Sequence, residues 1–122
     1  MSNARARRLD DAFGALADPT RRKVIELLGR APLRASELAE AAAASRPGMS
    51  RHLRILKDAG LVREEGDEQD ARARVYCLEQ GAFEGVKTWL ERVETFWADQ
   101  LGAFKELAEA RALETKAKVS KK

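Results

Sequence analysis

Cysteine and histidine are nearly absent from this chain of 122 residues, which contains one of each, Cys77 and His52. A single cysteine excludes an intrachain disulfide framework. A zinc or soft-metal site needs three or four cysteine, histidine or carboxylate ligands, so we expect no metal site and no other cofactor. The sequence also lacks a nucleophile–base pair, paired carboxylates and a glycine-rich phosphate loop. We therefore expect a protein that is not an enzyme.

Long apolar runs are absent as well. No segment approaches the roughly 20 residues of a membrane span, and no secretory signal follows the first residues. We expect a soluble cytoplasmic protein with no membrane partner. The formal net charge is only +3, although charged residues make up 35% of the chain. The signs are segregated, with basic residues concentrated in 46–57 and acidic ones in 64–70, and such segregation produces local anion-binding surfaces.

The chain has the length of one domain of modest stability, which dimerisation would increase. Residues 1–8 are small and basic and are predicted to form a flexible N-terminus. Asp18 followed by Pro19 predicts a helix start, because aspartate caps free N–H groups and proline fits the first turn. Ser45 predicts a second such start, and Gly60 predicts where that helix stops. The predicted helices cover residues 9–17, 19–28, a segment that begins at 35 or 36, and 46–59.

After residue 60 the apolar period changes from 3.6 towards 2, which predicts antiparallel strands over 61–65 and 73–78. A long helix is predicted over 82–112, followed by a disordered basic tail over 113–122. The two helices on either side of Ser45 are joined by about four residues, the spacing of a helix-turn-helix. The predicted fold is mainly α with a small β-hairpin (α+β). It is a winged helix-turn-helix domain over 9–112, with about five helices and a two-stranded wing before the last long helix.

The helix predicted over residues 46–59 has one apolar and one basic face. Met49, Leu53 and Leu56 recur at the spacing of a core face, which directs the opposite face to solvent. Arginine donates two hydrogen bonds to guanine, and serine bonds base edges or phosphate. A solvated charged face is the alternative interpretation, but the helix-turn-helix context favours DNA. The candidate DNA contacts are Ser45, Arg46, Pro47, Ser50, Arg51, His52, Arg54 and Lys57 on this helix, and Arg72 and Arg74 beside the wing loop.

Two single residues leave alternatives open. His52 lies at the rim of the apolar face, where it either contacts DNA at the groove edge or forms a partly buried imidazole bonded to backbone. Cys77 shares a strand face with Val75. Free cysteines are most often small buried apolar residues, and we favour that interpretation over redox sensing.

Aromatic and aliphatic residues recur at three- and four-residue steps along the last predicted helix. This apolar surface is too wide for one partner, so we expect it to pack on its own domain and on a second subunit. The alternative is that Trp89, Phe96 and Trp97 line a pocket for an apolar inducer, and plain interface packing is favoured. The candidate dimer-interface residues are Leu9, Phe13, Trp89, Val93, Phe96, Trp97, Leu101 and Phe104, on the dimerisation helices 9–17 and 82–112.

Three segments, 16–22, 45–62 and 74–78, resemble ArsR-type (arsenic-repressor-like) winged-helix regulators. The resemblance runs from about Leu9 to Leu107. It implies a homodimer built on the first and last helices, binding to operator DNA that represses promoters, and release by an inducer. Many such regulators sense metals through cysteines or histidines that this chain lacks. Two further departures from the family pattern concern the turn and the wing. Ala43 stands where glycine is usual, which predicts a turn without left-handed backbone geometry. The wing tip is acidic, which disfavours a close phosphate contact.

Three functional hypotheses follow. The favoured one is a homodimeric, metal-independent, sequence-specific regulator, a repressor of its own or a neighbouring promoter, bound to double-stranded DNA at an imperfect palindrome. The second is a winged-helix module that uses the same helix on an acidic protein. The third is a nonspecific architectural DNA binder, whose affinity would fall steeply with salt and ignore sequence.

Overall fold

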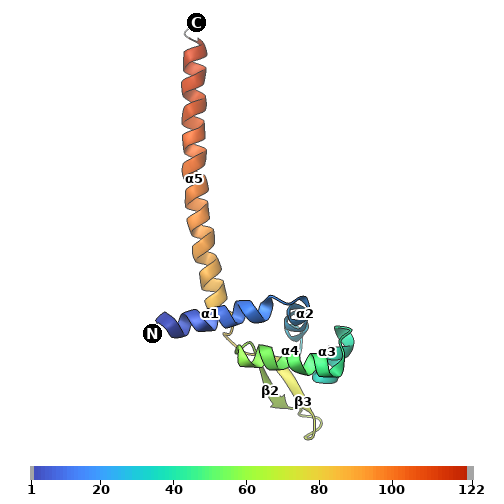
Figure 1. The fold of residues 1–122 in the computed structure, drawn as a ribbon. Helices are drawn as coiled ribbons and strands as arrows, with labels where there is room; N and C mark the ends of the chain where they lie inside the picture. Colours follow the sequence, from blue (N-terminus) through green and yellow to red (C-terminus); the bar gives the residue numbers. More distant parts are fainter. Residues whose placement is uncertain (1, 121–122) are drawn as a thin grey trace. The chain divides into compact units, whose positions relative to one another are not determined.

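A computed structural model describes residues 2–120, with side chains for residues 4–118. The chain divides into two units, 1–86 and 87–122, and each is described by itself. The elements, drawn in Figure 1, are α1 (Ser2–Leu16), α2 (Pro19–Leu28), β1 (Leu33–Arg34), α3 (Ala35–Ala41), α4 (Arg46–Asp58), β2 (Val62–Gly66), β3 (Arg74–Leu78) and α5 (Glu84–Ser120).

The two predicted caps are confirmed. A carboxylate oxygen of Asp18 accepts a 2.9 Å hydrogen bond from the backbone N–H of Arg21, and Pro19 opens α2. The hydroxyl oxygen of Ser45 accepts a 3.1 Å bond from the N–H of Gly48 at the start of α4. Each cap satisfies one of the N–H groups that a helix start leaves without a partner.

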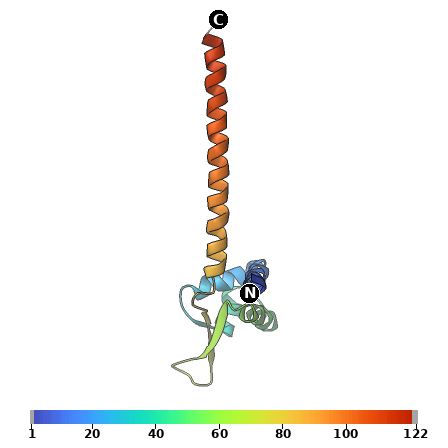
Figure 2. The ribbon, with the colours of Figure 1, turned by 90° about the vertical axis from the view of Figure 1, so that its left-hand side faces the viewer.

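The wing is the hairpin of β2 and β3, which extends from the helices of the first unit in Figure 2. Its register pairs Val62 with Leu78 and Gly66 with Arg74. The third strand, β1, pairs antiparallel with β3, so that the sheet order is β1-β3-β2. We expected a two-stranded wing, and the two-residue β1 adds a strand that is too short to leave a period-2 pattern.

The core of the first unit lies between the helices and the sheet. One valine of α2, one leucine of α3, and a methionine and two leucines of α4 are fully buried. Phe83 and Val86, at the end of the unit, pack against this cluster. Burial of such side chains stabilises each by about 1.5–3 kcal/mol. The largest fully buried side chains are Val24, Leu38, Met49, Leu53, Leu56 and Leu61. This cluster fixes which face of α4 points inward.

The turn between α3 and α4 contradicts one expectation. Ala43 has φ +52°, a left-handed conformation that alanine was expected to avoid. Two hydrogen bonds explain the outcome: Ala43 N–H donates to Glu40 at 3.2 Å and Ala44 N–H donates to Ala39 at 2.9 Å. These two bonds form a Schellman motif, which satisfies the last carbonyls of α3 and offsets the cost of left-handed alanine.

Both ends of the chain differ from expectation over the described residues. The composition predicts a flexible segment over 1–8 and a disordered tail over 113–122. In the structure α1 begins at Ser2 and α5 continues to Ser120, so residues 2–8 and 113–120 are helical. Alanine and arginine over 4–8, and leucine, glutamate, lysine and alanine in 113–118, are strong helix formers. Residues 1, 121 and 122 lie outside the described part of the chain.

Candidate nucleic-acid interface

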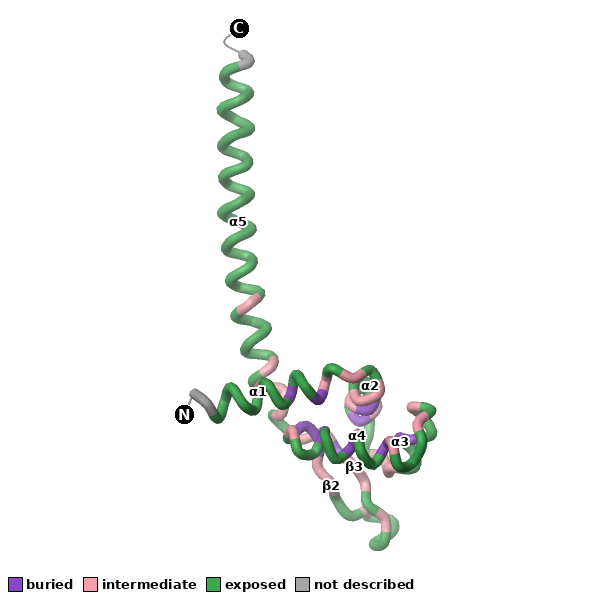
Figure 3. The backbone as a smooth tube through the Cα atoms, viewed as in Figure 1, coloured by how far each residue is buried: buried purple, intermediate pink, exposed green. Residues whose placement is uncertain are grey.

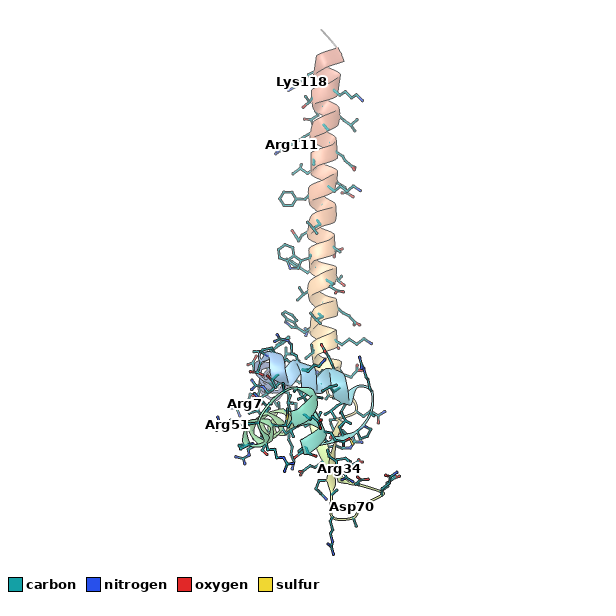
Figure 4. The ribbon with its side chains drawn as sticks, turned by 90° about the vertical axis from the view of Figure 1, so that its right-hand side faces the viewer. Arg7, Arg34, Arg51, Asp70, Arg111 and Lys118 are labelled. Carbon is teal, nitrogen blue, oxygen red and sulfur yellow. The ribbon has the colours of Figure 1, made fainter. Side chains whose placement is uncertain are left out.

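Helix α4 presents one face to the core and the other to solvent. Met49, Leu53 and Leu56 are at most 1% exposed. Ser50 and Arg51, one or two residues away, lie on the exposed side, and Figure 4 marks Arg51 on this helix. The outward orientation predicted for this face is therefore confirmed. The predicted DNA contacts on α4 and its cap that are exposed are Ser45, Arg46, Pro47, Ser50, Arg51, Arg54 and Lys57.

The guanidinium groups of this face are not neutralised by the protein. Within the part of the chain whose side chains are described, Arg46, Arg51 and Arg54 take part in no ion pair or side-chain hydrogen bond. Exposed cations without carboxylate partners keep all their donors and produce a positive potential. The face can therefore bind an anion without first breaking an internal contact.

Lys57, at the end of the same face, is different. Its ammonium lies 3.2 Å from Oε2 of Glu64 on β2, and the hydroxyl of Tyr76 donates to Oε1 of the same carboxylate at 2.7 Å. The Tyr76 hydrogen bond first, and the Lys57 hydrogen bond second, lower the pKa of Glu64. Lys57 thus joins α4 to the wing, and its charge is shared with an acid. The sequence pattern of α4 carries no signal for this pairing.

His52 points towards the junction of α1 and α2. Its Nδ1 lies 3.3 Å from Nη1 of Arg21 and 3.9 Å from Oδ2 of Asp18. The same arginine donates through Nε to the carbonyl of Ala15 at 2.7 Å. We expected either a groove-edge contact or a bond to backbone. The imidazole is half-buried, and its Nδ1 faces side chains rather than a backbone group, because Arg21 reaches back across this junction. Its contact with DNA stays a prediction.

The wing places its two candidate arginines at the surface. Arg72 and Arg74 are exposed, and the backbone N–H of Arg72 donates to Oδ1 of Asp70 at 3.0 Å. A third basic residue was missed: Arg34, on β1, donates through Nε and Nη2 to Oδ2 of Asp67, at 3.0 Å and 2.6 Å. A separation of 33 residues leaves no local pattern from which the pair could be predicted.

Large apolar side chains are exposed on α5. Trp97 is 56% exposed and Phe104 72% exposed, and all described residues from Glu94 to Lys118 are exposed in Figure 3. The rings of Phe96 and Trp97 make an edge-to-face contact at 6.1 Å. Of the other candidates for a dimer interface, Leu101 and, at 37%, Phe13 and Trp89 are exposed, whereas Leu9 and Val93 are half-buried. Their role in dimerisation stays a prediction.

Cys77 is buried, as expected for a small apolar residue. Burial first, and the Glu65 carboxylate second, raise the pKa of its thiol. Among the described residues, no group of three or more histidine, cysteine, aspartate or glutamate side chains is arranged to hold a metal ion. No helix in that part of the chain is long and apolar enough to cross a membrane.

Comparisons with known proteins agree with this arrangement. Residues 16–65 match the family described as a helix-turn-helix domain. The chain is 38% identical over 106 residues to the HTH-type transcriptional regulator Rv2034 of Mycobacterium tuberculosis, over 87% of this chain and 94% of the relative. It is 32% identical over 82 residues to the transcriptional repressor SdpR of Bacillus subtilis, which is 67% of this chain and 88% of the relative. The solved structure of an ArsR-like transcriptional regulator from Rhodococcus sp. RHA1 is 31% identical in sequence and has a TM-score of 0.71. The match covers 90% of this chain and 98% of that one.

The pair α3–α4 followed by the β2–β3 hairpin defines a winged helix-turn-helix protein. With the identity and coverage of its relatives, the chain belongs to the ArsR family of transcriptional regulators. The expected fold class and family are confirmed.

Proposed function

We propose that the protein is a homodimeric, sequence-specific DNA-binding repressor that inserts α4 into the major groove. The observation that supports this most directly is the pair of exposed guanidinium groups of Arg51 and Arg54 on the outer face of α4, with Met49 and Leu53 buried behind them. A helix fixed by its apolar face holds its outer side chains in one orientation, which base readout requires.

Phosphate binding would fix the register of α4 on the duplex. The hydroxyl oxygen of Ser45 is used in the cap, but its proton remains available to donate, and the first N–H groups of α4 can bind a phosphate oxygen. Arg46, Arg72 and Arg74 add charge near the two ends of this surface. Phosphate contacts set position and base contacts set sequence, so we assign base readout to Ser50, Arg51 and Arg54.

The homodimer is proposed from α5. Trp97, Leu101 and Phe104 would cost free energy if they stayed exposed to water, because large exposed apolar patches mark interaction surfaces. A two-fold dimer would place two α4 helices on half-sites about one helical turn apart, or a multiple of it, and so read an imperfect palindrome. Repression is proposed because the relative from Bacillus subtilis bears the name of a repressor.

Metal independence is proposed from the ligand inventory. One cysteine and one histidine are present; Cys77 is buried, and His52 faces Arg21. Neither is free to join a three- or four-ligand site. Added zinc should therefore leave the affinity for DNA unchanged.

Selection of bound sites from random duplexes tests the proposal. We expect enrichment of a palindrome with half-sites about 10 base pairs apart or a multiple of that, bound with a Kd of about 10⁻⁸ M or tighter at physiological salt. Binding without enrichment would indicate a nonspecific architectural protein. No binding to any duplex would contradict the proposal and favour the protein-interaction module.

A further inference from the structure

The pair between Arg34 and Asp67 connects the helix-turn-helix to the wing. Arg34 lies in β1, directly before α3, and its backbone N–H donates to Oε1 of Glu37 at 2.9 Å in the first turn of that helix. Its guanidinium donates through two nitrogens to one oxygen of Asp67. Figure 4 labels Arg34 next to the wing and Asp70 in the wing loop. One side chain thus joins the start of α3 to the start of this loop.

Asp67 is held from both sides. Its other carboxylate oxygen, Oδ1, accepts from the backbone N–H of Gln69 at 3.0 Å, and its own N–H donates to the carbonyl of Ala73 at 3.1 Å. The Gln69 N–H first, and Arg34 second, lower the pKa of this carboxyl group. Its side chain is 17% exposed, whereas the next residue, Glu68, is exposed and makes no ion pair or side-chain hydrogen bond within the described residues.

We propose that Arg34 and Asp67 are positioning residues for DNA binding: their ion pair fixes the wing loop relative to the helix-turn-helix, so that Arg72 and Arg74 meet the DNA backbone in register with α4. The inference rests on the proposed function. It gives Asp67 a positioning role, whereas the acidic composition of the wing tip alone would suggest only repulsion of phosphate. Asp67 does not act as a free phosphate-repelling charge, because Arg34 pairs with it at short range.

The two roles of Asp67 predict opposite effects of removing its charge. If the carboxylate only repelled phosphate, the neutral variant would bind DNA more tightly, and the released Arg34 would strengthen this gain. If the pair positions the wing, the neutral variant binds more weakly despite its more positive net charge. The sign of the change in affinity therefore separates positioning from simple electrostatics.

The decisive variant is Asp67→Asn. An asparagine Oδ1 can still accept from the Gln69 N–H, whereas the Nδ2 that replaces Oδ2 is a donor and cannot accept from Arg34. Glu68→Gln is the matched control, because it removes the same charge one residue away without breaking a bond. Affinity is measured on the duplex that site selection enriches, together with hydroxyl-radical footprints.

We expect Asp67→Asn to weaken binding about tenfold, the size of one lost charge-assisted contact, and to lose protection at the flanks while protection in the major groove remains. Glu68→Gln should bind as tightly as the unchanged protein or more tightly. A tighter Asp67→Asn complex, or an unchanged flank footprint, would overturn the inference.

Amide hydrogen exchange of residues 69–73 without DNA tests the pair separately. Exchange should accelerate in Asp67→Asn and not in Glu68→Gln, and equal rates in both would overturn the inference. If the unchanged protein binds no duplex selectively, the proposed function fails and the role of the pair in DNA binding fails with it. Selective binding together with a tighter Asp67→Asn complex removes the role of the pair alone.

Discussion

The hydroxyl of Tyr76 on β3 donates a 2.7 Å hydrogen bond to the carboxylate of Glu64 on β2, at the point where Lys57 of α4 approaches the same group from the other side. Burial first, and this carboxylate second, raise the pKa of Tyr76 to about 12. The wing is thereby joined to the helix-turn-helix by a second polar contact besides the Arg34–Asp67 pair.

This contact predicts the behaviour of the protein at high pH. Tyr76 is the only tyrosine, so the ultraviolet absorbance of tyrosinate reports its ionisation alone. The midpoint should lie near pH 12 in the folded protein and near 10 after unfolding. Between about pH 10 and 12 the folded state binds more protons than the unfolded state, so the free energy of unfolding should fall as the pH rises through this range. Below about pH 10, Tyr76 should contribute no pH dependence to the free energy of unfolding.

The control for this titration is Glu64→Gln. The Tyr76 midpoint should fall in the variant, but only part of the way to that of free tyrosine, because burial is the larger cause and persists. A midpoint near 10 in the folded protein, with Glu64 intact, would contradict the burial and the hydrogen bond together.

The left-handed Ala43 predicts that glycine stabilises the turn. Ala43→Gly removes a cost of about 1–2 kcal/mol for left-handed alanine and adds about 0.4–1 kcal/mol of unfolded-state entropy. The net effect should be a gain of about 0.5–1 kcal/mol in the free energy of unfolding, measured by urea denaturation.

Gly60 provides the matched control. It occupies the equivalent position after α4, with φ +76°, and Gly60 and Leu61 donate to Lys57 and Leu56 in the same pattern. Since no atom beyond the adjacent residues lies within 4 Å of a Cβ built there, Gly60→Ala tests backbone geometry alone and should destabilise the protein by about 1 kcal/mol. A loss of stability in Ala43→Gly would mean that residue 43 does not adopt the left-handed conformation.

Local sequence signals predicted the helix starts and the orientation of α4 well. Asp18 and Ser45 act within three residues of themselves, and the spacing of Met49, Leu53 and Leu56 reports directly which face is buried. Where only such short-range rules apply, pattern and structure agree, because each rule involves one hydrogen bond or one helix face.

The missed features depend on partners far along the chain. Strand β1 pairs Leu33 with Tyr76, Arg34 pairs with Asp67, and Lys57, whose contact with DNA stays a prediction, pairs with Glu64. None of these pairings leaves a local period, and each depends on the tertiary fold. The Ala43 turn was misjudged because residue preference was considered without the two hydrogen bonds that compensate for it.

The exposed aromatic residues of α5 predict a dimer that depends on Trp97. Trp97→Ala should raise the dissociation constant of the dimer at least about thirtyfold, as expected for an interfacial tryptophan whose loss costs about 2 kcal/mol or more. Sedimentation at falling protein concentration measures this constant. DNA affinity should fall in parallel, because each half-site then binds separately.

Thr95→Ala is the control for the dimer, since Thr95 is exposed on the same helix but projects from the opposite side to Trp97. It should leave the dissociation constant unchanged. A Trp97→Ala variant that is still dimeric at nanomolar concentration would contradict the proposed interface.

The most direct test of the proposed function is the ratio of the Kd values for a scrambled and a selected duplex, compared between Arg51→Ala and Arg111→Ala. Both residues are exposed arginines, so each variant loses one positive charge. We predict that Arg51→Ala reduces the ratio about 5- to 150-fold, which corresponds to the 1–3 kcal/mol of one bidentate base contact. Arg111→Ala should leave the ratio unchanged. Equal losses of affinity on both duplexes in Arg51→Ala, or none, would contradict sequence readout by α4.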